Sequence, residues 1–390
     1  MKRFTQSVAF ALVCAAPVAA NPYCDALQQT ENLPKKFAKK GPFHVDAETG
    51  WIVAQDQMTS NFTVTEETRS LWAEITSEFA KRGVKLSALI APPRPLFAPN
   101  ASANFGYDPV QAQLDFSAHI ASLNDAGIVA PDLSQLAKKP TAEGFYFKRD
   151  THWSQTGALV SAAHLAETLQ GRPVAEIIEP IRFEDTYAEK GSLSMVVKET
   201  CGQRPSAETV PAPTYSVSGN ASALLGTSNK ETVALVGTSF SDRYQKDAYQ
   251  VADALAYALD MDVENFSVTG GGLVGAMEAF ITSGALDSKR YKTVVWETPY
   301  TTPLTDLNGL RQILGALQNH GQKQDIYSGD LTAEWTTIKH SFSTADHQVL
   351  ALQIPGFTTG KLDVEFRGAD GQKARVKLVK SDRVAATDRS

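Results

Sequence analysis

Asp150 and His152 stand two positions apart in a stretch, 145–157, whose residue types could carry out acid–base chemistry. Ser154 or Thr156 can cap the helix that 158–169 predicts, so the pair lies in the loop before the first helical turn. There Asp150 can accept the proton of one ring nitrogen of His152 and leave the other nitrogen as a base. Taken alone, the pair is better explained as a capped loop with a satisfied polar histidine, so a partner is needed.

A serine turn further along the chain supplies a candidate partner. The apolar run 232–236 predicts a buried strand, and Gly237 with the hydroxyl residues after it predicts a sharp turn toward a helix over 248–259. A serine on such a turn, here Ser239, lies beside free backbone N–H groups, as in a nucleophile elbow. The match to G-x-S-x-G is partial because Ser241 replaces the second glycine. Ser239 or Ser241 acting only as a helix cap is an equally good account of this segment.

Together the two stretches resemble the alginate O-acetyltransferase family of periplasmic proteins, the AlgX/AlgJ type with an SGNH hydrolase-like domain. The resemblance rests on the Arg-Asp-Thr-His-Trp run at 149–153, the Gly-Thr-Ser-Phe-Ser run at 237–241 and, more weakly, Val-Val-Trp-Glu at 294–297. It extends from about residue 21 to beyond 303. It implies Ser239 as nucleophile, His152 as base and Asp150 as orienting acid, with the acid–histidine pair before the serine in the chain.

The alternation of helical and strand-like segments predicts an α/β fold, a doubly wound sheet with helices on both faces. With 43% hydrophobic and 21% charged residues, the 390-residue chain has the composition of a globular protein with a substantial core. The predicted helices are 61–81, 109–124, 158–169, 248–259 and 274–283. The predicted strands are 84–90, 127–130, 232–236, 263–268 and 293–296.

The chain divides into three parts by its sequence character. Residues 1–20 have a basic start, an apolar run too short to span a bilayer and a small-residue cleavage site after Ala20, which predicts a cleaved signal peptide rather than a signal anchor. Residues 21–324 form the expected catalytic domain, with a polar, proline-broken insertion at 172–227. Residues 325–390 predict a small β-sandwich-like domain from strand-like segments at 349–354, 361–366 and 374–379.

The family resemblance implies a carbohydrate-binding module in the C-terminal part. Its aromatic and basic residues could form a platform for an acidic sugar polymer, although a plain aromatic core with solvated charges is the simpler explanation. The residues concerned are Trp335, Lys339, His340, Arg367 and Lys373.

Export is consistent with the cysteines and the charge. Cys14 leaves with the signal, so Cys24 and Cys201 remain as a pair that can form a disulfide in an oxidising compartment. The formal net charge of −6 becomes more negative by two when Lys2 and Arg3 are removed, which argues against nucleic acid as a partner. The histidines and cysteines show no metal-ligand spacing, and no cofactor motif is present.

Four further residues are candidates for binding the substrate or a developing oxyanion. Arg94 follows a strand on a proline-rich loop, and Gly271 and Gly272 follow another strand and could offer backbone N–H groups. Tyr300 follows the last strand of the predicted sheet. A solvated arginine and a crowded turn are the corresponding alternatives without function.

The family implies double displacement, in which an acetyl-serine forms and a sugar hydroxyl then collects the acetyl group. The expected acceptor is an exopolysaccharide, alginate or another acidic polymer, and the donor could be passed on by a membrane acyltransferase. Two alternatives stay open: an acetylesterase of SGNH type, in which water takes the acetyl group, and a non-catalytic scaffold of a polysaccharide secretion complex. The triad alone does not decide between them.

Overall fold

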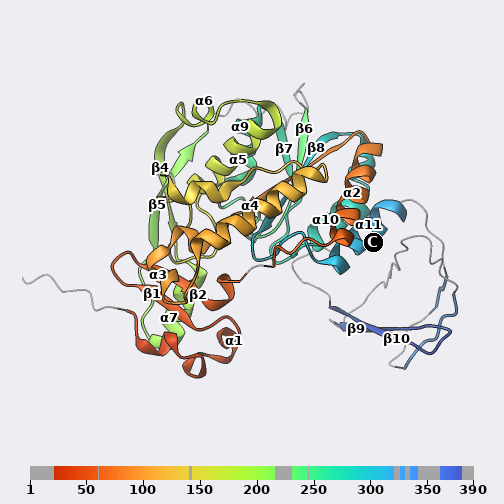
Figure 1. Cartoon of the computed structure of the whole chain (residues 1–390), viewed down its shortest axis with the longest axis horizontal. Coiled ribbons are helices and arrows are strands. Elements are labelled where there is room, and N and C mark those ends of the chain that lie inside the picture. The colour runs from red at the N-terminus through yellow and green to blue at the C-terminus, as the bar shows by residue number, and fades with distance from the viewer. Residues whose placement is uncertain are drawn as a thin grey trace, which may run out of the picture.

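The centre of the molecule is a four-stranded parallel sheet (Figure 1). The computed structural model describes residues 22–59, 61–139, 143–215, 231–244, 246–319, 326–329, 334–340 and 361–379. The sheet order is β3-β8-β6-β7, and each neighbouring pair is parallel. The strands are β3 (Lys85–Ala91), β8 (Tyr291–Pro299), β6 (Thr232–Val236) and β7 (Asp262–Asn265). A parallel bridge from Ser87 to Val129 adds one short contact at the β3 edge.

Helices cover both faces of this sheet because successive side chains of a buried strand point to opposite sides. In β3, Leu86, Ala88 and Ile90 belong to one core cluster, whereas Leu89 and Ala91 belong to the other. The first cluster is closed by α2 (Glu66–Lys81), α4 (Pro109–Asp125), α10 (Gly275–Thr282) and α11 (Leu307–Asn319). The second is closed mainly by α5 (Gln155–Gln170) and α9 (Val251–Leu259). The prediction of an α/β fold with helices on both faces is confirmed.

Local sequence signals explain where the main helices begin. The Thr65 hydroxyl accepts a hydrogen bond from Thr68 N at the start of α2, and the Asp108 carboxylate caps α4 immediately before Pro109. Of the two cap candidates for α5, Ser154 is the one used, since its hydroxyl accepts from Gly157 N at 3.2 Å. This cap fixes the position at which the acid–histidine loop ends.

Two small antiparallel sheets and the helix α7 (Ser192–Cys201) contact the acid–histidine loop, and three further short helices lie elsewhere in the fold. The strands are β1 (Phe43–Asp46) paired with β2 (Trp51–Ala54), and β4 (Arg182–Glu189) paired with β5 (Glu208–Thr214). The further short helices are α1 (Lys35–Ala38), α3 (Pro99–Ala103) and α6 (Val174–Ile178). Segment 172–215 therefore contains regular structure, and its interpretation as part of an insertion, like the other domain boundaries, stays a prediction.

The predicted disulfide is present and links the N-terminal part of the chain to the last residue of α7. Cys24 and Cys201 are bonded, with Cα atoms 5.7 Å apart. Leu193, Val196 and Val197 of α7 share a small core with residues of the β1–β2 hairpin. The first turn of α7 contacts Asp150, so the disulfide and the acid–histidine loop are connected by one helix.

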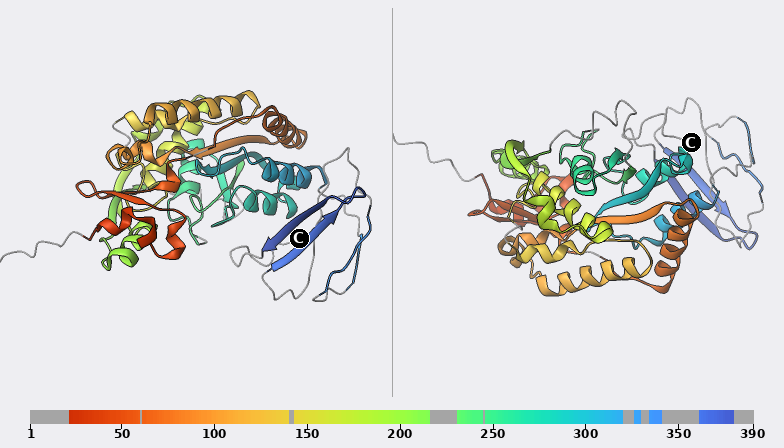
Figure 2. Two further views of the ribbon diagram at one scale, coloured as in Figure 1. Left: turned by 60° about the horizontal axis from the view of Figure 1, so that its bottom comes forward. Right: turned by 90° about the horizontal axis from the view of Figure 1, so that it is seen from above.

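The C-terminal part is described only in pieces. Strands β9 (Lys361–Arg367) and β10 (Lys373–Val379) form an antiparallel hairpin, which lies at the opposite end of the molecule from β1–β2 (Figures 1 and 2). The segment 349–354 lies outside the described residues, as does the predicted signal 1–20, so the β-sandwich stays a prediction. Within the described ranges, no helix combines the length and apolar character needed to cross a membrane.

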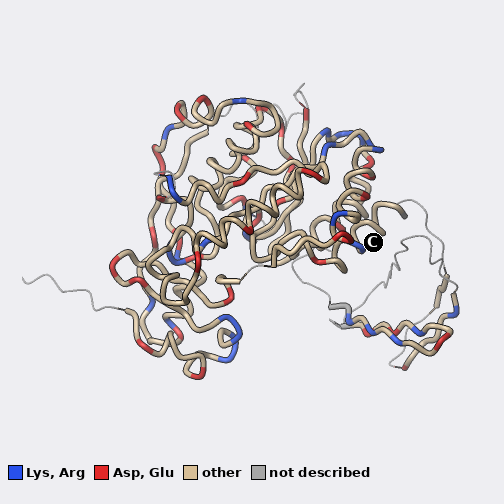
Figure 3. Tube along the Cα trace, in the orientation of Figure 1, with Lys and Arg blue, Asp and Glu red and all other residues tan. Residues whose placement is uncertain are grey.

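The strand and helix predictions hold best in the buried sheet. Strand 232–236 is β6, whereas the predicted strand 127–130 is reduced to the single bridge at Val129. Charges of both signs alternate over much of the trace, and a group of exposed lysines (Lys35, Lys36, Lys39 and Lys40) lies on and after α1 (Figure 3).

Replacing both Cys24 and Cys201 by serine is expected to lower the free energy of unfolding by about 5 kcal/mol. The bond closes a loop with a sequence separation of 177 residues and so restricts the unfolded chain. Removing it increases the conformational entropy of the unfolded state, which favours unfolding. Urea unfolding of the double variant, and of the wild type with and without reductant, measures the effect. Equal midpoints for oxidised wild type and double variant would contradict it.

Candidate active site

The acid–histidine pair sits on a tight loop held by main-chain hydrogen bonds. Tyr146 and Trp153 form an antiparallel bridge, Phe147 N donates to His152 O at 3.3 Å, and Ser154 N donates to Phe145 O at 2.9 Å. The loop therefore folds back on itself just before α5, and its tip presents the side chains of Asp150 and His152.

Ser239 lies on the turn that follows β6. Thr238 O accepts hydrogen bonds from Ser241 N at 3.1 Å and Asp242 N at 3.0 Å, which makes one helix-like turn around the serine. The segment after β7 continues to pair alongside, since Val268 N donates to Gly237 O at 3.0 Å. The turn is thus anchored on two sides while Ser239 itself remains half-buried.

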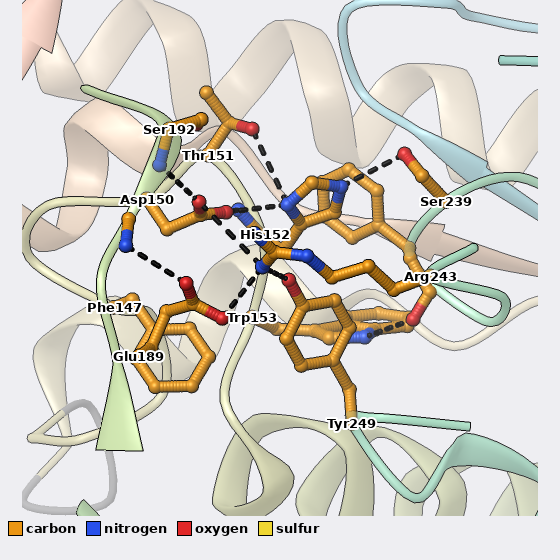
Figure 4. A network of polar contacts seen from close by, with 12 residues as sticks. Phe147, Asp150, Thr151, His152, Trp153, Glu189, Ser192, Ser239, Arg243 and Tyr249 are labelled. Carbon is orange, nitrogen blue, oxygen red and sulfur yellow. Dashed lines mark hydrogen bonds and ion pairs between the residues drawn. The ribbon is translucent and has the colours of Figure 1, made fainter. Parts of the chain in front are cut away.

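The structure brings the three residues together in one hydrogen-bonded chain (Figure 4). His152 Nε2 lies 2.8 Å from Ser239 Oγ, and His152 Nδ1 is hydrogen-bonded to Asp150 Oδ1. The side chain of His152 is 12% exposed, whereas that of Asp150 is fully buried. Because Asp150 accepts the Nδ1 proton, Nε2 is free to accept the proton of the serine hydroxyl.

Asp150 is ionised in spite of its burial. Burial alone would raise its pKa, but His152, Arg243 and the Ser192 N–H outweigh it and hold the pKa of Asp150 well below its usual range. Ser192 N, in the first turn of α7, donates to Asp150 Oδ2 at 2.6 Å, and His152 N donates to Oδ1 at 3.0 Å. Arg243 Nη1 lies 3.8 Å from Oδ2.

Arg243 joins the acid to a second carboxylate. Its Nη1 is 2.6 Å from Glu189 Oε2, and it also donates to the Tyr249 hydroxyl (Figure 4). Burial opposes the charge of Arg243, but the surrounding acidic groups keep its pKa above the usual value. Sequence analysis missed Glu189, which lies on β4, and Tyr249, which follows the serine turn. Arg243 had a weak signal, since it stands four residues after Ser239.

Aromatic rings fix the plane of the His152 imidazole. The ring stacks on Tyr249 with centroids 5.1 Å apart, and the Phe240 ring lies 4.7 Å away on a tilted plane. Trp153 Nε1 donates to Phe240 O at 3.1 Å, which links the histidine loop directly to the serine turn. These contacts limit rotation of the imidazole away from Ser239.

The buried side chain of Glu297 fixes the serine turn through hydrogen bonds with Thr238. Glu297, near the end of β8, is fully buried, and its Oε2 accepts from Thr238 N at 2.7 Å. The Thr238 hydroxyl also donates to this carboxylate, with Oε1 3.0 Å away. Burial raises the pKa of Glu297 to about 7. A Cβ on Gly237 would lie 2.5 Å from Glu297 Oε2, so this approach requires glycine at 237.

The structure places Arg94 away from the role that sequence analysis predicted for it. Its guanidinium is completely buried and donates to three carbonyl oxygens, Ile52 O at 2.8 Å, Phe147 O at 2.9 Å and Lys148 O at 2.7 Å. Burial lowers its pKa to about 10. Arg94 therefore supports the backbone of the acid–histidine loop, and these contacts replace the predicted contact with substrate.

The structure also places Tyr300 and Gly271 differently from what sequence analysis predicted. Tyr300 is buried and its hydroxyl donates to Gln57 O at 3.2 Å, so it packs beneath the surface. Gly271 N donates to Val268 O at 2.9 Å, which occupies the N–H that was expected to face an oxyanion. The role of Gly272 stays a prediction.

The main-chain amide of Ser239 is the donor that the turn leaves available. The amides of Thr238, Phe240, Ser241 and Asp242 donate to acceptors on Glu297 or Thr238. Among the described residues, none accepts a hydrogen bond from Ser239 N. This N–H is suited to an anionic oxygen that forms next to Ser239 Oγ.

The parallel sheet and the serine turn after β6 define an SGNH hydrolase-like domain of the α/β class. The chain belongs to the family described as "SGNH hydrolase-like domain, acetyltransferase AlgX", whose model matches residues 45–300. That match covers more than half of the chain and includes Asp150, His152 and Ser239.

Similar proteins carry the names of alginate biosynthesis proteins. The alginate biosynthesis protein AlgX of Pseudomonas syringae pv. tomato is 27% identical over 308 residues, which is 76% of this chain and 63% of that protein. The AlgX protein of Pseudomonas aeruginosa is 28% identical, over 80% of this chain and 69% of that protein. The probable alginate O-acetylase AlgJ of Pseudomonas aeruginosa is 27% identical, over 70% of this chain and 74% of that protein.

A solved structure supports the fold. The structure of Pseudomonas aeruginosa AlgX matches with a TM-score of 0.71 and 22% sequence identity, covering 94% of this chain and 90% of that one. The chain thus spans about 63% of the length of the Pseudomonas syringae relative but nearly all of the solved AlgX chain.

Replacing Glu297 by glutamine is expected to flatten the dependence of stability on pH. Because the native pKa of about 7 lies above the ordinary value of 4.5, the native state holds a proton that the unfolded chain releases. This stabilisation is complete below the unfolded pKa and is lost as pH rises through 7, by about 3 kcal/mol.

Urea midpoints on either side of this pH window measure the effect in the wild type and in Glu297→Gln, with the exposed Glu179→Gln as control. Glutamine can still accept from Thr238 N and donate to its hydroxyl, so the turn is retained. An unchanged pH dependence in Glu297→Gln would show that another group is responsible.

Proposed function

We propose that this chain is a periplasmic O-acetyltransferase that moves an acetyl group, through an acetyl-Ser239 intermediate, onto hydroxyls of an exopolysaccharide. The observation that carries the proposal is the hydrogen-bonded chain from Asp150 through His152 to Ser239. A scaffold without chemistry would not require a buried carboxylate, an oriented imidazole and a serine hydroxyl in one hydrogen-bonded line.

In the first half-reaction, His152 Nε2 takes the proton of Ser239 Oγ as that oxygen attacks the carbonyl carbon of the acetyl donor. The tetrahedral oxyanion is stabilised by Ser239 N–H, and the resulting imidazolium by Asp150. When the intermediate collapses, the bond to the donor oxygen breaks and His152 returns the proton to that leaving oxygen. The acetyl group then remains on Ser239.

In the second half-reaction, the acceptor hydroxyl takes the place of the donor. His152 Nε2 removes its proton, the sugar oxygen attacks the acetyl carbon, and the proton returns to Ser239 Oγ as the ester to serine breaks. If water enters instead, acetate is released and the reaction is that of an esterase. The outcome depends on which acceptor occupies the site.

The proposed acceptor class is supported by the names of the relatives. Those names refer to alginate biosynthesis and alginate O-acetylation, which supports alginate or another acidic polymer as the acceptor here. The predicted signal peptide and the Cys24–Cys201 disulfide support export to the periplasm. A membrane acyltransferase as the source of the acetyl group and secretion-complex proteins as partners belong to the same proposal.

Incubation with an activated acetyl ester is expected to leave an acetyl group on Ser239. Mass spectrometry of the intact chain and its peptides detects the adduct in the wild type, and Ser239→Ala should show none. Ser241→Ala is the matched control, two residues away on the same turn, and should still be acetylated.

The fate of this adduct separates transferase from esterase. Adding an oligouronate should move the acetyl group to the sugar, whereas an adduct lost at the same rate to water alone would indicate an esterase. Adducts of equal yield in wild type and Ser239→Ala would contradict the assigned nucleophile.

Asp150→Asn is expected to slow formation of the adduct by about 10³- to 10⁴-fold, because the amide favours the wrong tautomer of His152. The rate of acetylation from the same ester, followed by rapid quench, gives the measurement. Asp185→Asn, an exposed acid on β4, is the control and should acetylate at the wild-type rate. An Asp150→Asn rate within a few-fold of wild type would remove Asp150 from the mechanism.

A further inference from the structure

A groove of about 1010 Å³ lies beside the acid–histidine loop, and neither Ser239 nor His152 lines it. Five segments of the chain form it: Pro22 with Tyr23, the β1–β2 turn with Trp51, Phe97, residues between 143 and 149 before and within the loop, and 203–211, which leads into β5. The Cys24–Cys201 disulfide joins two of these parts close to the groove. Its walls are therefore held together covalently.

Three cationic side chains line the groove. Lys148, Arg149 and Arg204 all line it, and each is only partly exposed. Arg204 Nη2 donates to Gly191 O at 3.1 Å, which uses one of its five N–H donors. Arg149 lies beside the Tyr23 hydroxyl, whose pKa is raised by burial against the opposing effect of Arg149.

The groove also contains three carboxylates, of which Glu208 is bonded to the backbone of the cationic residues. Its Oε2 accepts hydrogen bonds from Lys148 N at 2.9 Å and Arg149 N at 3.4 Å, and burial raises its pKa against the opposing charges of Arg149 and Lys148. Glu48 and Glu143 also line the groove and are exposed. A ligand carboxylate that enters the groove meets the guanidinium groups of Arg149 and Arg204, which carry five N–H donors each.

The groove also contains rigid aromatic surface. Trp51 is half-buried and the buried Arg94 guanidinium lies 4.7 Å from its ring centroid, which fixes the indole. An aromatic face can pack against the apolar C–H face of a sugar ring, while arginine pairs with a carboxylate through two parallel hydrogen bonds. The combination suits a sugar ring that bears a carboxylate.

We infer that this groove binds a segment of an acidic polysaccharide, with uronate carboxylates on Arg149 and sugar rings against Trp51 and Tyr23. The inference rests on the proposed function for the class of polymer. Arg149 immediately precedes Asp150, and Glu208 holds the amides of Lys148 and Arg149. A polymer bound here lies against the same loop that carries His152, so the groove keeps the acceptor chain on the enzyme next to the site.

The test measures binding of a short oligouronate, and of a neutral glucose oligomer of the same length, to the full mature chain carrying Ser239→Ala. This background cannot form acetyl-serine, so binding is seen without chemistry. Calorimetry should detect the oligouronate, with affinity that falls as salt rises, and weaker or no binding of the neutral oligomer. Arg149→Gln should weaken oligouronate binding about tenfold.

Ala207 provides a matched pair of charge variants, because it is exposed and lines the groove. Ala207→Glu should weaken oligouronate binding about tenfold by like-charge repulsion, whereas Ala207→Lys should leave it equal or tighter. Arg182→Gln, an exposed arginine outside the groove, should bind as the parent does. Equal losses in Ala207→Glu and Ala207→Lys, no oligouronate binding, or equal binding of the neutral oligomer would overturn the inference.

The outcomes separate the groove from the proposed chemistry. Oligouronate binding with the expected variant pattern, but no acetyl transfer by the chain with intact Ser239, would retain the groove and reject the transferase. Acetyl transfer to an oligouronate that is unchanged in an Ala207→Glu chain with intact Ser239 would retain the transferase and reject the groove.

Discussion

The buried negative charge of Asp150 is the constraint on which the site depends. A carboxylate without exposure to solvent is costly unless opposite charge and hydrogen-bond donors surround it. Here the donors come from three different parts of the fold: His152 on the same loop, Ser192 at the start of α7, and Arg243 on the serine turn. Satisfying this charge requires these segments to meet, and their meeting also positions the histidine opposite Ser239.

Further buried polar side chains bind the groups that surround Asp150 and Ser239. Glu189 binds Arg243, Arg94 binds the carbonyl oxygens of the loop, and Glu297 binds the amide of Thr238. Each is a polar side chain directed at the backbone or at a charged group, and each lies well inside the protein. The region around the site is therefore polar and extensively hydrogen-bonded, whereas the two faces of the sheet are closed by apolar side chains.

The sequence was sufficient for the four strands of the central sheet, for most of the helices that cover it and for the three residues that form one hydrogen-bonded chain, but not for the small sheets β1–β2 and β4–β5 or for α7. Apolar runs bounded by glycine and capping residues locate β6, α2 and α4 because those signals are local. Convergence of Asp150, His152 and Ser239 could be anticipated only from the family resemblance, since 87 residues separate the histidine from the serine. Arg94 shows the limit, because an arginine on a proline-rich loop is normally solvated, and its burial depends on carbonyl groups that tertiary folding collects. Glu189 and Tyr249 carried no local signal either, because their bonds to Arg243 form only when the tertiary fold brings these residues together.

The contact between Gly237, just after β6, and Glu297 of the neighbouring strand β8 restricts both positions, since it requires glycine at 237 and a hydrogen-bond acceptor at 297. Any side chain at 237 would collide with the carboxylate, and a shorter residue at 297 would leave the Thr238 amide without its acceptor. In evolutionary terms the two sites are therefore coupled. A lineage that lost the glycine would displace the serine turn, and one that replaced the glutamate by a residue without a suitable acceptor oxygen would leave the Thr238 amide unpaired. Descendants that keep the turn are expected to inherit glycine at 237 together with glutamate or glutamine at 297.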